Sequence, residues 1–160
     1  ENFESAIGEA RASLRFSDRT VLHLGASRDY ESATRGGYFS FIRGYTSFEK
    51  GIGDFMLLHV DVSFDHREFG RYIPPAAVDS DGNPVETIAS SSNRVDDMIR
   101  AGALLDIDFM RLFGASIGYR FETNITEYVL TTDFGDGGPA SENHFDFTEH
   151  RIFATLNLRY

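Results

Sequence analysis

The chain has 160 residues, enough for one domain with a core, and no cysteine, which excludes disulfide and thiol chemistry. Its formal net charge of −10 argues against nucleic-acid binding, because contact with phosphates needs a basic face. Mean hydropathy is −0.27, and no run approaches the ~20 apolar residues of a membrane helix. A membrane β-barrel escapes that test, since only every second residue of its strands meets lipid.

Seven segments alternate polar and apolar residues with a period of two, which is typical of strands with two different faces. They cover residues 7–16, 20–30, 38–48, 55–65, 98–110, 113–124 and 146–160. The segment 55–65 is the clearest, with an apolar file of Met56, Leu58, Val60, Val62 and Phe64 and a polar file of His59, Asp61, Ser63 and Asp65. In 38–48 we expect Tyr38, Ile42 and Phe48 to face lipid, because an arginine such as Arg43 would cost ~2–4 kcal/mol at mid-membrane. The fold class predicted is all-β and antiparallel.

The connections between these segments alternate in length. Short turns are expected at 17–19, 50–53 and 111–112, and longer connections at 31–37, 66–97 and 125–145. The pair Asp81-Gly82 predicts a small hairpin inside the connection 66–97. Strict sorting of short turns to one end and long loops to the other is typical of outer-membrane barrels. We therefore expect an up-and-down transmembrane β-barrel domain with long external loops at about 66–97 and 125–145.

The last segment has apolar residues at every second position and ends on an aromatic residue, which resembles the closing strand of bacterial outer-membrane barrels. Strands of about eleven residues, tilted by ~40°, rise ~28 Å, close to the hydrocarbon thickness of a bilayer. With seven strands and the last one ending at the short-turn side, the first strand begins on the outside. Because bacterial barrels have an even number of strands, we expect this single domain to be the C-terminal part of a larger barrel.

The polar file carries the candidate functional residues, which are expected to line a lumen. They are Arg11, Arg15, His59, Asp61, Arg100, Asp106, Asp108, Arg120, Glu122, Arg151 and Arg159. So many ionisable groups cannot lie in a dry core without nearly complete pairing. Two interpretations follow: a wet channel for polar or anionic solutes, or a plugged barrel whose charges satisfy one another.

Several short sequence motifs resemble those of a known family. One motif is the segment 17–20 (SDRT), which is followed by Leu22 and Leu24. The other motifs are 28–32 (RDYES), 94–97 (RVDD) and 118–122 (GYRFE). Together they resemble the outer-membrane β-barrel porin family associated with exopolysaccharide export. The resemblance implies a longer protein that forms a pore through which a secreted polysaccharide leaves the cell. It implies no catalytic residues.

Three other sequence patterns bear on catalysis, calcium binding and transition-metal binding. Residues 114–118 match G-x-S-x-G, but that nucleophile motif needs a strand-to-helix elbow, and here the strand pattern continues, so no enzyme is expected. Residues 79–83 (DSDGN) offer oxygen ligands for Ca²⁺ but lack the rest of an EF-hand loop, which favours a turn. The histidines have no ligand spacing, so we expect no transition metal and no cofactor.

The function predicted is a passive outer-membrane pore for polysaccharide export or polar solutes, located in the bacterial outer membrane. Its expected partners are outer-membrane lipid, lipopolysaccharide, the polysaccharide and its export machinery, with no nucleic acid. Acidic residues of the second long loop, Asp133, Asp136, Glu142 and Asp146, are candidates to contact lipopolysaccharide through divalent ions. Two alternatives stay open: a soluble lipocalin-like barrel that buries the apolar file around a small hydrophobic ligand, and a structural outer-membrane barrel that does not conduct.

Overall fold

A computed structural model describes residues 7–32, 38–70, 77–78, 81–82, 84–85, 87–89, 94–110, 113–132 and 141–158. These residues form strands, turns, bends and short irregular segments, with no helix among them. The long strands are β1 (Gly8–Ser17), β2 (Thr20–Ser32), β3 (Tyr38–Ile52), β4 (Met56–Phe69), β8 (Val95–Met110), β9 (Phe113–Ile125) and β12 (Phe147–Leu158). The short ones are β5 (Ala77–Val78), β6 (Pro84–Val85), β7 (Thr87–Ala89), β10 (Val129–Thr132) and β11 (Ser141–His144).

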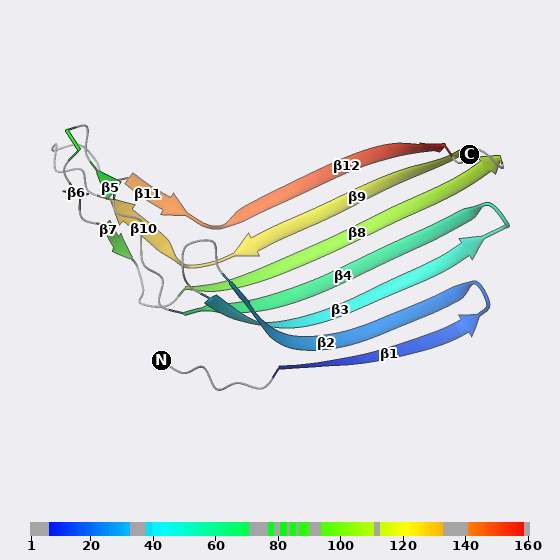
Figure 1. Cartoon of the computed structure of the whole chain (residues 1–160), viewed down its shortest axis with the longest axis horizontal. Coiled ribbons are helices and arrows are strands. Elements are labelled where there is room, and N and C mark those ends of the chain that lie inside the picture. The colour runs from blue at the N-terminus through cyan, green and yellow to red at the C-terminus, as the bar shows by residue number, and fades with distance from the viewer. Residues whose placement is uncertain are drawn as a thin grey trace.

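The long strands make one antiparallel sheet in the order β1-β2-β3-β4-β8-β9-β12, a meander in which neighbours along the chain are neighbours in space. Figure 1 shows the strands side by side, with the short turns at one end and β5, β6, β7, β10 and β11 at the other. All seven predicted strands are thus present. The sheet is open among the described residues, since β1 and β12 are its two edges and do not pair with each other.

The pairing register separates polar from apolar residues across the whole width of the sheet. Residues directly opposite in an antiparallel pair share a face. One such row runs through Leu14, Leu22, Phe48, Val60, Ala103, Tyr119 and Ile152. The next row, on the other face, runs through Ser13, His23, Ser47, Asp61, Gly102, Arg120 and Arg151. We call these the apolar face and the polar face.

Several strand boundaries differ from the sequence prediction. The turn expected at 50–53 begins later, because Lys50 and Gly51 still pair with β4 and the positive φ of 61° falls at Gly53. A φ in that region favours glycine, so the chain turns there and not at Gly51. The strands also extend into the first long connection, since β4 continues to Phe69 and β8 begins at Val95.

The long connections contain short strands. The hairpin predicted around Asp81-Gly82 is present, with β5 paired to β6 and a φ of 84° at Gly82. A small sheet in the order β11-β10-β7, which the sequence did not predict, links the two long connections. Within the described residues no helix is long and apolar enough to cross a membrane.

Candidate functional site: the polar face

The register places ten of the predicted lumen-lining residues on the polar face. They are Arg11, Arg15, His59, Asp61, Arg100, Asp106, Asp108, Arg120, Glu122 and Arg151. Arg159 lies outside the described residues. The structure brings some of them together: Arg100 Nε lies 3.5 Å from Glu122 Oε1, and His59 Nε2 lies 3.8 Å from Asp106 Oδ2. Arg11 and Arg15 lie apart from these pairs on the edge strand β1.

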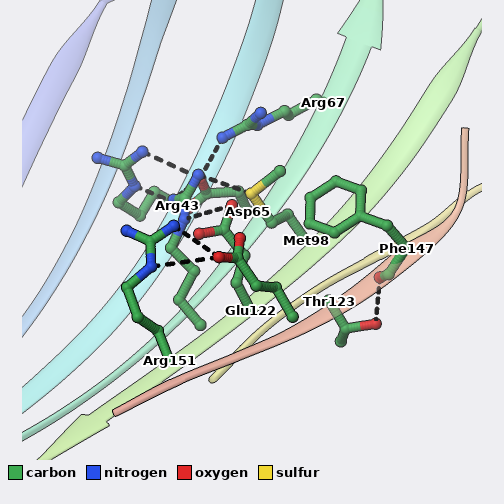
Figure 2. A network of polar contacts seen from close by, with 10 residues as sticks. Arg43, Asp65, Arg67, Met98, Glu122, Thr123, Phe147 and Arg151 are labelled. Carbon is green, nitrogen blue, oxygen red and sulfur yellow. Dashed lines mark hydrogen bonds and ion pairs between the residues drawn. The ribbon is translucent and has the colours of Figure 1, made fainter. Parts of the chain in front are cut away.

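The most strongly bonded part of this face is an arginine cluster, by which we mean Arg43, Arg67 and Arg100 around Asp65. Figure 2 labels Arg43, Arg67 and Asp65 within it. Arg43 donates from Nε to Asp65 Oδ1 at 2.7 Å and from Nη2 to Oδ2 at 2.9 Å. Arg67 Nη2 and Arg100 Nη1 donate to the same Oδ2 at 3.1 and 2.8 Å. Asp65 is fully buried, at 0% exposed, and among the described residues its charge is neutralised by these three guanidinium groups.

Aromatic rings hold two of these guanidinium groups in place. The Arg43 guanidinium carbon lies 5.0 Å from the centre of the Phe41 ring, and that of Arg67 lies 5.4 Å from the centre of the Phe39 ring. Phe39 and Phe41 are buried, although they lie on the polar face. Such stacking fixes the plane of the guanidinium group as well as adding attraction.

A fourth arginine, Arg94, makes a separate set of contacts closer to the long-loop end. Arg94 donates to both carboxylate oxygens of Asp96, which is 2% exposed. Its guanidinium carbon lies 4.6 Å from the centre of the Phe69 ring and 4.3 Å from that of Phe145. This stack joins the end of β4 to the segment between β11 and β12, so it connects the polar face to the end of the β10–β11 pair.

In the opposite, short-turn half of the same face, the accessible charges of β3 and β8 are acidic, while β1 contributes the exposed cation Arg15. Glu49 and Asp106 flank His59 at 3.6 and 3.8 Å, and Asp108 is exposed near the end of β8. Among the described residues no group of three or more His, Cys, Asp or Glu side chains is placed to hold a metal ion.

Two glycines on the polar face allow aromatic rings to lie flat on the sheet. The ring of Tyr45 covers Gly25, directly opposite, where a Cβ would come within 2.2 Å of Tyr45 Cζ, and its hydroxyl reaches Glu9 Oε1 at 2.9 Å. The ring of Phe153 likewise covers Gly118, where a Cβ would lie 2.3 Å from Cζ. Gly118, the last residue of the G-x-S-x-G match, therefore has a packing role. The match lies within β9, and its serine, Ser116, donates a hydrogen bond to Asp106 Oδ1 at 2.5 Å.

Sequence reasoning missed the centre of this site. It put Asp65 in the polar file, yet it did not include Arg43, Arg67 or Arg94 among the site residues. Arg67 and Arg94 fell in a segment predicted to be a loop. The available signal was the continuation of alternation past Asp65, since Arg67 and Phe69 follow it at a period of two.

Two other predicted sites are only partly described. Of the Ca²⁺ candidate 79–83, the described residues are Asp81 and Gly82. Of the acidic loop, Asp133 and Asp136 lie outside the described residues, while Glu142 and Asp146 flank His144 at 3.5 and 3.9 Å.

Comparisons with protein-family models, with curated proteins and with solved structures find no match to this chain. The geometry of the two faces is therefore the basis for any functional conclusion.

Proposed function

We propose that this chain forms a sector of the wall of an outer-membrane β-barrel, with the apolar face against lipid and the polar face lining a water-filled pore. The observation that carries the proposal is the exposure of the apolar face. Leu156 is 83% exposed, Ile152 79% and Ile117 54%, and all three lie on that face. An apolar patch that runs across seven strands is far larger than a soluble monomer exposes.

The ionic networks support the same orientation. In a soluble sheet the apolar face is covered and charges point to water, whereas here the most buried side chains are Asp65 and Asp96 on the polar face. The strands also have the length of membrane strands, between 10 and 16 residues for the seven of the main sheet. About ten residues suffice for a tilted strand to cross a bilayer.

The open edges support a larger barrel. β1 and β12 both run from the long-loop end to the short-turn end, so direct pairing between them would be parallel (Figure 1). A closed antiparallel barrel therefore needs an odd number of further strands between these edges. Such strands also satisfy the free backbone groups of both edges, which hydrocarbon does not tolerate.

The solute proposed is a polar polymer. The sequence resemblance to the exopolysaccharide-export porins is the reason for proposing a polysaccharide, and the hydroxyl and charged groups of the polar face suit a hydrated chain. The contacts expected with lipopolysaccharide and export machinery belong to the same proposal.

Planar-bilayer recording tests the pore. The purified protein is added to one side of a lipid bilayer, and stepwise increases in ion conductance are expected. Folded protein that inserts into the bilayer without conducting would favour the structural barrel instead. Protein that stays folded and monodisperse in buffer without detergent would favour the lipocalin-like alternative.

A further inference from the structure

The arginine cluster presents positive charge to the solvent and hides its negative charge. The side chains of Arg43, Arg100 and Arg67 are 34%, 28% and 15% exposed, whereas that of Asp65 is 0% exposed. A solute that approaches this part of the polar face therefore meets guanidinium groups first. One partly exposed acid, Glu122, pairs with the cluster: it lies 3.5 Å from Arg100 Nε and is 26% exposed.

The cluster has more donors than the protein uses. Each guanidinium group carries about five N–H donors, whereas one carboxylate offers about four lone-pair sites. Four contacts from three arginines converge on the two oxygens of Asp65. Arg100 also contacts Met98 Sδ and Glu122 Oε1. The partly exposed guanidinium groups of Arg43 and Arg100 still have N–H donors that a ligand can reach.

A hollow of about 580 Å³ adjoins the cluster on the polar face. Arg43 and Arg100 line it together with the hydroxyl residues Ser27, Ser47 and Ser63 and the carboxylate residues Glu9, Asp29 and Asp61. Of these groups, the two guanidinium groups suit an anionic group of a ligand, and the hydroxyl groups suit its further polar atoms. Asp61 lies on the short-turn side of the hollow, because it precedes Ser63 and Asp65 along β4.

We propose that Arg43, Arg67 and Arg100 form a binding site for an oxyanion: a carboxylate, phosphate or sulfate group, either as a free ion or carried by a sugar. Guanidinium groups bind such anions through two parallel N–H···O bonds, and here Asp65 and the Phe39 and Phe41 rings hold them in fixed planes. The site deepens the proposed function, because it assigns a charge preference to the long-loop half of the pore.

Binding is measured with the whole protein folded in detergent, from the rise of its unfolding midpoint with ligand concentration, because a ligand that binds only the folded state stabilises it. The probes are sulfate against chloride at equal ionic strength, and glucuronate against glucose. Saturable stabilisation by sulfate is expected for a site that takes a free ion, and by glucuronate for one that takes a sugar acid. Neither chloride nor glucose should reproduce it.

The variants Arg67→Gln and Arg100→Gln are each expected to weaken this binding about tenfold, the effect of losing one charge-assisted hydrogen bond. The matched control is Arg15→Gln, which removes one exposed cation from the same face outside the cluster and should bind as the wild type does. Arg100→Gln carries the test if Arg67→Gln does not fold.

Equal stabilisation by sulfate and chloride, or equal weakening by Arg15→Gln, would overturn the site. Because the measurement needs no conductance, a protein that binds sulfate but forms no pore would refute the proposed function and leave the binding site standing.

Discussion

Asp65 and Val62 lie three residues apart on β4, yet their environments are opposite. Asp65 is 0% exposed beneath three guanidinium groups, while Val62, on the other face, is 43% exposed with open surface around it. In a water-soluble sheet the burial of an aspartate and a valine would be reversed. The comparison of the two faces teaches that the charged side chains supply the specific contacts of this sheet, while many of the apolar side chains are exposed.

The largest expected effect comes from breaking the polar face at its centre. Asp65→Ala leaves three guanidinium groups without their shared carboxylate, and removal of one partner from a buried ionic group costs about 3–5 kcal/mol. Urea unfolding of the protein folded in lipid vesicles measures the loss. Asp61→Ala, an exposed carboxylate on the same strand and face, is the control and should change stability by less than about 1 kcal/mol. Equal losses for the two variants would mean that the cluster does not hold the sheet.

The next effect compares the faces directly at neighbouring exposed positions of β12. Ala154→Arg places a cation on the apolar face, where lipid makes it cost about 2 kcal/mol or more near the midplane. Thr155→Arg places the same cation on the polar face, where the cost should be near zero. Unfolding from vesicles gives both values. Equal tolerance at both positions is the result expected if water bathes both faces, and it would contradict the lipid assignment.

A smaller effect is expected from adding one methyl group to a glycine on each face. Gly118→Ala forces the Phe153 ring off β9, because the new Cβ would lie 2.3 Å from Cζ, and such overpacking costs roughly 1–3 kcal/mol. Gly44→Ala, on the apolar face, meets no atom within 4 Å and should be neutral or slightly stabilising. The same unfolding assay compares them. A Gly118→Ala variant as stable as the wild type would show that the Phe153 ring can adopt another position without cost.

The smallest effect concerns the short turns, which belong to neither face. Arg19 donates to Gly53 O at 2.5 Å and to Asp54 Oδ1 at 2.6 Å, and so links two adjacent turns. The ion pair is exposed, with side chains 56% and 88% accessible, so Arg19→Gln should cost less than about 1 kcal/mol. Its effect should decrease further in high salt. A loss as large as that of Asp65→Ala would mean that the turns, rather than the polar face, control stability.

Much of the sheet could be predicted from the sequence because alternation with period two is a local signal. Met56 to Phe64 and Ile152 to Leu156 each define their strand and its apolar side without reference to any other segment. The antiparallel pairing of β1 with β2, of β3 with β4 and of β8 with β9 follows from short turns, since consecutive strands joined by two or three residues have no other way to pair. The register then brings the polar files of all seven strands together.

The centre of the candidate site could not be predicted because it depends on contacts between distant segments. Arg43, Arg67 and Arg100 come from three strands, and only the register of β3, β4 and β8 brings them to Asp65. The Arg94 stack between Phe69 and Phe145 likewise joins segments whose sequence indicates only loops. Sequence periodicity assigns a residue to a face, but it does not say which neighbour across the sheet it will meet.

Spin labelling at two neighbouring positions of β4 tests the account most directly, since the chain has no cysteine of its own to interfere. Nitroxide labels are attached to Val62→Cys and, separately, to Asp61→Cys, and the protein is reconstituted into lipid vesicles. Collision with oxygen, which concentrates in lipid, and with a water-soluble nickel complex is then measured by electron paramagnetic resonance. The account predicts that the Val62 label meets oxygen and excludes nickel, while the Asp61 label meets nickel. A Val62 label shielded from both reagents, or open to nickel, would contradict it.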